Sequence, residues 1–140
     1  MTSHTFTVFG VPAPQGSKRH VGNGILVESS EKVKPWREAV KWAAYQAGIP
    51  PLSAAVEVQL TFYLQRPRGH YGTGRNVKVL KPSAPLYPAV RPDLDKLGRS
   101  TLDGLTDSGV IGDDSRVIAL ELTKWYGRPR CEVTIREVGP

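Results

Sequence analysis

The chain has 140 residues, of which 19 are Lys or Arg and 13 are Asp or Glu, so its net charge is +6 at pH 7. We expect one domain over residues 1–140, and no apolar run approaches the roughly 18 residues of a membrane span. The basic excess favours a polyanionic partner, nucleic acid before an anionic membrane surface, with a generic basic surface as the alternative. We expect no secretory signal, and the single cysteine fits a reducing, cytoplasmic setting.

The N-terminal part predicts two short strands around a loop. Residues 5–9 alternate between polar and apolar side chains, which predicts a strand. Residues 10–24 are rich in Pro and Gly and carry Lys18 and Arg19, which favours a basic loop. Residues 25–27 then predict a second, brief strand.

A helix and a longer strand follow. Apolar residues recur at helical spacing between Pro35, which suits a first helical turn, and Gly48, which suits the position just past a helix end. Trp36 and Trp42 are expected to pack against other residues rather than to stack on bases. Residues 55–65 alternate without a break, which predicts a strand with one buried face.

Residues 66–92 contain six Lys or Arg residues, five prolines and no acidic residue. We expect a long basic loop, flexible by composition, that contacts a nucleic-acid backbone, because unstructured loops of this length are usually functional or disordered. The predicted DNA-binding residues of the whole chain are Lys18, Arg19, Arg66, Arg68, Arg75, Lys78, Lys81 and Arg91.

Every aspartate of this basic chain lies between Asp93 and Asp114. Leucines at helical spacing after Pro92 predict an amphipathic helix over about 94–105. At about 100° per residue, Asp95 and two later side chains form an exposed Asp-Arg-Asp stripe opposite the leucines. Asp103 and Asp107 are interpreted as mostly solvated residues of this helix.

A turn at Asp113 and Asp114 follows the helix. If it folds back, its carboxylates meet those of Asp93 and Asp95 at one helix end. Converging carboxylates repel each other, and a hard cation such as Mg²⁺ or Mn²⁺ relieves the repulsion, lowers the pKa of a bound water and stabilises phosphoryl charge. The pattern predicts a metal site for phosphodiester hydrolysis, with helix capping and turn formation as the alternative roles of these residues.

The C-terminal part predicts two strands, over 117–126 and 131–138, joined as a hairpin by the GRPR turn. The order of elements favours an α+β fold, a small mixed β-sheet with helices packed on one face.

The stretch RPDLDKLGRSTLDGL, the DD turn and the following SRVIALELTKWYG resemble the RusA family of Holliday junction resolvases, including its phage and prophage members, most strongly over 91–127. The resemblance implies a homodimer, intertwined or closely packed, that uses Mg²⁺ to cut four-way DNA junctions by paired symmetric incisions in a bacterial or phage-infected cytoplasm. The family's essential acids correspond to Asp93, Asp95 and Asp114, with Asp113 as a neighbour.

Two positions depart from the family's pattern. Arg99 stands where the family has a catalytic lysine, and Lys96 stands where it has asparagine. Arginine stays protonated and cannot act as a general base, so we expect Lys96, three residues away on the helix surface, to cover part of that role. A non-catalytic nucleic-acid-binding protein of the same fold is the main alternative function. A metal-assisted transferase is disfavoured, because no Gly-rich phosphate loop opens a helix.

Overall fold

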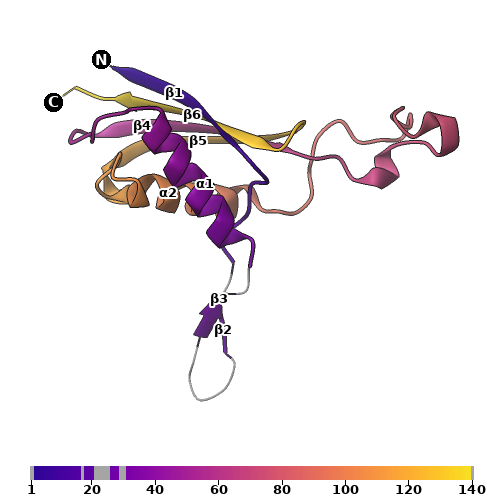
Figure 1. The fold of residues 1–140 in the computed structure, drawn as a ribbon, viewed down its shortest axis with the longest axis horizontal. Helices are drawn as coiled ribbons and strands as arrows, with labels where there is room; N and C mark the ends of the chain where they lie inside the picture. The colour runs from indigo at the N-terminus through magenta and orange to yellow at the C-terminus, as the bar shows by residue number, and fades with distance from the viewer. Residues whose placement is uncertain (1, 17, 21–25, 29–30, 140) are drawn as a thin grey trace.

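The structure, a computed structural model, describes residues 2–16, 18–20, 26–28 and 31–139. A mixed sheet of four strands carries two helices on one face, which confirms the predicted α+β class (Figure 1). The elements are β1 (Ser3–Phe9), β2 (Lys18–His20), β3 (Leu26–Glu28), α1 (Val33–Gln46), β4 (Val56–Leu64), α2 (Leu94–Asp107), β5 (Val117–Tyr126) and β6 (Arg130–Glu137), with short 3₁₀ turns at Arg68–His70, Gly74–Asn76 and Asp114–Arg116. Neither helix is long and apolar enough to cross a bilayer, and the described residues contain no other candidate span.

The strand order in the sheet is β1-β6-β4-β5. β6 pairs antiparallel with both β1 and β4, whereas β4 pairs parallel with β5. The predicted hairpin between the last two strands is therefore wrong, because β4 lies between β5 and β6. The connection passes the end of β4, where the Gly127 amide donates a hydrogen bond of 2.9 Å to the Leu64 carbonyl.

The core lies between the sheet and the two helices. The alternation in β4 buries Val58, Leu60 and Phe62 against the helices, and Leu97 and Leu105 of α2 are fully buried opposite them.

The two tryptophans of α1 differ. Trp36 is buried, and its indole N–H donates a hydrogen bond of 3.1 Å to Thr101 Oγ1 of α2, which confirms a packing role. Trp42 is 58% exposed, so its predicted packing role is wrong. It contacts only the edge of Tyr45 among the rings of the described residues.

A glycine allows α1 and α2 to approach closely. A Cβ atom on Gly104 would lie 2.8 Å from Cβ of Val40 and 3.1 Å from the carbonyl oxygen of Arg37. Glycine at this position lowers the helix propensity of α2, but a larger residue would prevent the two helices from packing this closely.

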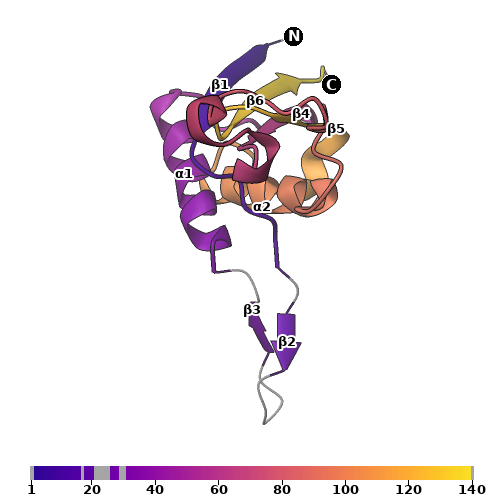
Figure 2. The ribbon, with the colours of Figure 1, turned by 90° about the vertical axis from the view of Figure 1, so that its right-hand side faces the viewer.

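Two extensions leave the body in different directions (Figures 1 and 2). β2 and β3 form an antiparallel hairpin, so residues 18–20 are a strand rather than the predicted loop. The predicted strand at 25–27 corresponds to β3, and Ile25 lies outside the described residues.

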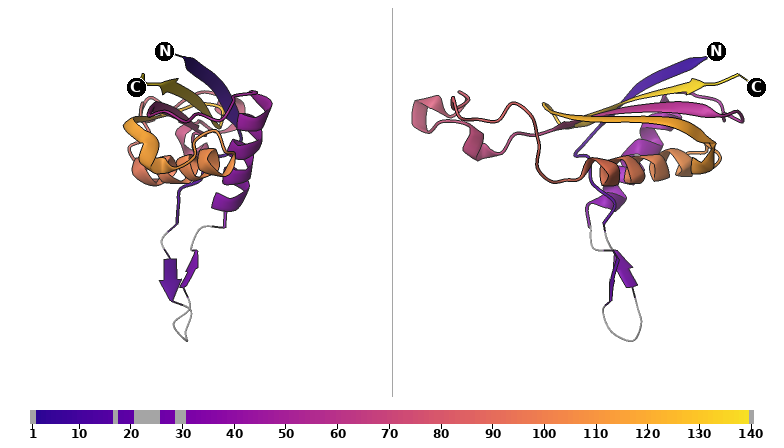
Figure 3. Two further views of the ribbon diagram at one scale, coloured as in Figure 1. Left: turned by 90° about the vertical axis from the view of Figure 1, so that its left-hand side faces the viewer. Right: turned by 180° about the vertical axis from the view of Figure 1, so that it is seen from behind.

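The second extension, residues 66–92, is called the arm below. Its two limbs are joined by backbone hydrogen bonds of 2.9 Å from Gly72 to Val79 and from Lys81 to His70. Tyr71 and Leu80 also form an isolated antiparallel bridge. The arm is thus a folded-back loop with internal backbone pairing, and it leads directly into the start of α2 (Figure 3).

Candidate active site

The start of α2 presents two exposed carboxylates, those of Asp93 and Asp95. Asp93 occupies the N-cap position with extended backbone, but its carboxylate makes no capping hydrogen bond. Its backbone carbonyl accepts the first helical bond, from the Leu97 amide, at 3.1 Å. The capping alternative therefore accounts for the backbone position of Asp93 but not for its carboxylate, which makes no capping bond.

A cavity of about 820 Å³ opens beside this helix end, and we call it the Asp93 cavity. Asp93, Lys96 and Arg91 contribute to its lining, together with Lys32 near the start of α1. The Lys96 ammonium lies 3.8 Å from the Asp93 carboxylate, with both side chains partly exposed. Arg99, one turn further along, is exposed and is absent from the described lining. Of the two predicted cations, Lys96 is the one that the structure places at the cavity.

The frame of the Asp93 cavity is fixed by contacts that the sequence did not reveal. The Ser100 hydroxyl donates a hydrogen bond of 2.6 Å to the Ala13 carbonyl, and the Gln15 amide donates one of 2.9 Å to the Lys96 carbonyl. These two bonds hold the loop after β1 against α2. The sequence predicts Ser100 only as part of the helix, because nothing in the spacing of the residues indicates that its hydroxyl bonds to Ala13, 87 residues earlier.

A lysine of β5 holds the arm where it enters the site. Lys124 Nζ donates hydrogen bonds to the carbonyls of Val90, at 2.6 Å, and Pro92, at 2.8 Å. The end of β5 is therefore tied to the residue immediately before Asp93. A charged donor with two carbonyl acceptors is stronger than an ordinary backbone contact, so this link fixes the position of the first carboxylate.

The other end of α2 carries carboxylates that already have partners. Asp107 forms an ion pair of 2.8 Å with Arg37 of α1, and Asp114 Oδ1 accepts a hydrogen bond of 2.7 Å from the Thr106 hydroxyl. Asp103 is half-buried rather than fully solvated, and its pKa is raised, first by burial and then by nearby Asp114 and Asp107, against the opposing effect of Arg37. The predicted solvated position is therefore wrong for Asp103 and confirmed for Asp107, which is exposed at the last residue of α2.

Asp113 has a local role in the turn after the helix. Its carboxylate accepts a hydrogen bond of 2.9 Å from the Ser115 amide, and this bond lowers the pKa of Asp113. The residue caps the short 3₁₀ turn that leads into β5. Asp113 neighbours Asp114, as predicted, but lies at the opposite end of α2 from Asp93 and Asp95.

The structure does not bring Asp114 to Asp93 and Asp95. Asp114 is bonded to Thr106, which lies thirteen residues after Asp93, or roughly 20 Å along the helix at 1.5 Å per residue. Oxygen ligands lie about 2.0–2.1 Å from Mg²⁺, so one ion cannot bind all three carboxylates in this conformation. The described part of the chain contains no group of three or more potential metal ligands. Asp93 and Asp95 remain as a pair of hard oxygen donors, which suits an ion that keeps waters and takes a substrate phosphate.

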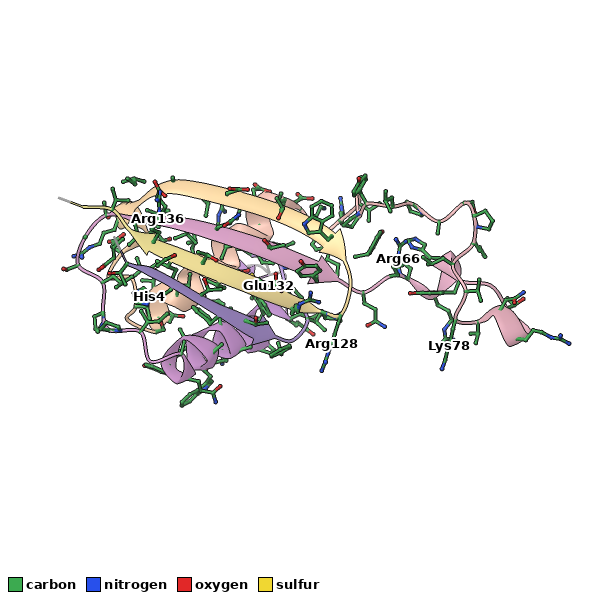
Figure 4. The ribbon with its side chains drawn as sticks, turned by 90° about the horizontal axis from the view of Figure 1, so that it is seen from above. His4, Arg66, Lys78, Arg128, Glu132 and Arg136 are labelled. Atoms are coloured by element: carbon green, nitrogen blue, oxygen red, sulfur yellow. The ribbon has the colours of Figure 1, made fainter. Side chains whose placement is uncertain are left out.

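The predicted DNA-binding residues occupy three places. Arg68, Arg75, Lys78 and Lys81 are exposed on the arm, and Figure 4 shows Lys78 well away from the body. Arg66 is half-buried at the base of the arm, and Arg91 lines the Asp93 cavity. Lys18 and Arg19 lie in β2, and their side chains are outside the described part.

Comparison with known proteins identifies a family for this chain. Residues 10–136 match the sequence profile of a family described as endodeoxyribonuclease RusA. The chain is also similar to the uncharacterized protein YqaN of Bacillus subtilis (strain 168), at 30% identity over 137 residues and 95% of each chain. The matched region contains both ends of α2, the arm and the whole of β4 and β5. This chain belongs to the RusA family of endodeoxyribonucleases.

Proposed function

We propose that this protein is a Mg²⁺-dependent endonuclease that resolves four-way DNA junctions and related branched DNA in the cytoplasm of a bacterium or a phage-infected host. The observation that carries the proposal is the pair of exposed carboxylates at Asp93 and Asp95, one of them lining a cavity next to an arm without acidic residues. Family membership supports the endonuclease activity. The six cations of the arm suit a phosphate backbone.

The residues of the site divide the work. Asp93 and Asp95 would hold the metal ion, which supplies an activated water and stabilises charge on the phosphoryl group when it is bound. Lys96 lies close enough to Asp93 to contact the substrate phosphate that the metal ion would bind. Its ammonium would then balance the negative charge that develops on that phosphate during the reaction. The arm holds the flanking backbone, and Lys124 keeps the arm's end fixed against the site.

We also propose that the active form is a homodimer whose interface includes β5. This strand is at the edge of the sheet, and Ile118 and Leu120 on it are 61% and 43% exposed. An open strand edge with apolar side chains is a ready surface for pairing, and a two-fold dimer matches the approximate two-fold symmetry of a four-way junction. Antiparallel pairing of two β5 strands would bring Asp114 of one copy toward the end of β5 in the other copy. That end contacts Pro92, next to Asp93, so the third acid would be supplied across the dimer.

The function is tested with a labelled synthetic four-way junction beside a linear duplex of the same sequence. Paired nicks in the junction are expected with Mg²⁺, with Mn²⁺ as a substitute, and none with EDTA. Binding of the junction without any metal-dependent nicks would reject the nuclease and favour the non-catalytic DNA-binding alternative. Sizing chromatography at micromolar concentration should show a dimer, and a clean monomer would argue against paired incision.

The shared site is tested by mixing two inactive proteins. Asp93→Asn and Asp114→Asn are each expected to bind the junction without cutting it. If Asp114 acts across the dimer, subunit exchange between the two variants produces heterodimers with one complete site, and nicking of a single strand returns. If both acids act within one chain, every heterodimer lacks a complete site and the mixture stays inactive.

Lys96→Ala and Arg99→Ala test the cationic role. Lys96→Ala should slow cutting on the order of 10-fold or more, because a charge that stabilises the reacting phosphate is lost. Arg99→Ala should have a smaller effect, since Arg99 is exposed and outside the described lining of the cavity. The single-turnover rate with saturating enzyme separates chemistry from binding. An undiminished rate in Lys96→Ala would contradict the assignment.

A further inference from the structure

A second cavity, of about 790 Å³, lies at the base of the arm, where the arm leaves β4 and passes the turn between β5 and β6. We call it the arm-base cavity. Its described lining contains none of the residues assigned above to metal binding or catalysis. Four aromatic side chains and two arginines contribute to it, and the described lining includes no carboxylate: Tyr71, Tyr87, Trp125, Tyr126, Arg66 and Arg128.

One wall of the arm-base cavity is held in place by Arg66. Its guanidinium lies over the Tyr126 ring, 4.4 Å from the centroid, and donates a hydrogen bond of 2.7 Å to the Pro85 carbonyl. His70 packs its ring edge-on against the same tyrosine, at 5.4 Å between centroids. Arg66 thereby joins both limbs of the arm to the end of β5. The wall is a positively charged surface on a fixed aromatic ring.

Another part of the lining is open to solvent. Trp125 and Tyr87 meet edge-on, with centroids 5.7 Å apart and an interplanar angle of 60°, and they remain 42% and 56% exposed. The neighbouring Leu86 is 70% exposed. Large apolar side chains gathered at one exposed place indicate a binding surface, because isolated exposure is ordinary but clustering is not.

The charge around the arm-base cavity selects an anion. Arg128 is exposed on the turn between β5 and β6, where its guanidinium lies over the exposed ring of Phe9, 5.5 Å from the centroid, and Figure 4 shows it at the same end of the sheet as Arg66. Among the described residues neither guanidinium pairs with a carboxylate. Aromatic rings that accept a base, next to arginines that accept a phosphate, are the elements of a surface for unpaired nucleic acid.

We infer that the arm-base cavity takes an unstacked nucleotide of the DNA substrate, with its base against Trp125 and Tyr87 and its phosphate on Arg128. This inference rests on the proposed function, because strands that exchange at a branch point offer bases that have lost a stacking neighbour. The site gives a preference for branched over linear duplex DNA that the arm's cations alone do not give, since backbone contacts carry no information about base stacking.

The test compares Trp125→Ala with Trp42→Ala, a matched control on α1 that is 58% exposed and also meets a tyrosine edge-on, at 5.6 Å. Binding is measured by fluorescence anisotropy in EDTA, so that no cutting occurs. The probes are a labelled oligo-dT strand and an abasic strand of equal length and charge. Trp125→Ala should weaken binding of oligo-dT by roughly 5- to 100-fold, the scale of a base stacked on an aromatic ring. It should leave the abasic strand unaffected, Trp42→Ala should change neither, and Trp125→Phe should recover most of the affinity.

Two results would overturn the inference. Unchanged binding of oligo-dT by Trp125→Ala would show that no base stacks there. An equal loss for both strands would show that the tryptophan only supports the arm. The outcome is separate from the proposed function, because these measurements need no metal and no cleavage. If base stacking is observed but no junction is nicked with Mg²⁺, the proposed nuclease activity is wrong and the inference about the arm-base cavity still holds.

Discussion

Both ends of α2 carry aspartates, but the contacts of their carboxylates differ. At the start of the helix, Asp93 and Asp95 are exposed, and the Asp93 carboxylate caps nothing and lines a cavity. At the other end, Asp107 is paired with Arg37 and Asp114 is bonded to Thr106. The carboxylates at the far end are held by other parts of the chain at 2.7–2.8 Å, whereas Asp93 faces only Lys96 of the same helical turn, at 3.8 Å, and both side chains are partly exposed.

This difference shows what separates a binding site from a stabilising contact. A carboxylate held by a partner within the chain contributes to packing or turn geometry, and recruiting it to a metal requires that partner to be released. A carboxylate whose ion pair is long and exposed, like that of Asp93 with Lys96, costs little to recruit. The comparison therefore predicts that substitutions of Asp93 and Asp95 change cutting and leave stability unchanged, and that substitutions in the contacts between α1 and α2, at Arg37, Gly104 and Asp107, change stability and leave cutting unchanged.

The largest effect is expected from neutralising the first end. Asp93→Asn and Asp95→Asn should each lower the single-turnover rate of junction cutting on the order of 100-fold or more, because charge stabilisation in the transition state is lost. Their melting temperatures should match that of the unmodified chain. Asp107→Asn is the matched control on the same helix and should cut normally. Equal cutting rates for Asp93→Asn and Asp107→Asn would show that Asp93 is no more important for cutting than Asp107.

The next effect tests the packing of the other end. Gly104→Ala should destabilise the fold by about 1–3 kcal/mol, because its Cβ would overlap Val40 and approach the Arg37 backbone, at 2.8 Å and 3.1 Å. Gly98→Ala is the control: its Cβ would meet the end of the flexible Leu122 side chain, which can shift. Urea denaturation gives both free energies of unfolding. A larger cost at Gly98 than at Gly104 would contradict the expected ranking.

The smallest effect is expected from the ion pair between the helices. Arg37→Met should cost at most about 1 kcal/mol, since both partners are partly exposed and solvent screens the pair. The loss should shrink at high salt. Cutting should be unaffected, because Arg37 lies outside the described lining of the Asp93 cavity. A slower cutting rate with normal stability would assign Arg37 a role in cutting and contradict this expectation.

Periodicity predicted most of the elements but not their partners. Residues 55–65 alternate as a strand does, residues 117–126 are also predicted to form a strand, and both are strands with nearly the expected bounds. The four residues of the GRPR turn suit a hairpin, but they also suffice to pass one intervening strand. Nothing local distinguishes these cases, because β4, which lies between the two strands, belongs to a part of the chain more than fifty residues earlier.

The same limit applies to the candidate site. The helical wheel correctly placed Asp95 and Arg99 on an exposed face. It gave no information on where the chain travels after α2, and the expected return of Asp114 to the first turn does not occur within this chain. The arm-base cavity was missed although KWYGRPR interleaves aromatic and basic residues, because its Tyr87 comes from a distant segment of the chain.

The pairing of β1 with β6 has a consequence for how the protein is made. Ser3 is opposite Arg136, so the first strand finds its neighbour only after more than 130 residues have followed it. Contacts of such separation close large loops and slow folding. On the ribosome, β1 leaves the exit tunnel long before β6 exists, and β4 likewise lacks one of its two neighbours until the last strand appears. The sheet is therefore completed only after synthesis of β6, and a chain that ends before β6 lacks the strand that joins β1 to β4.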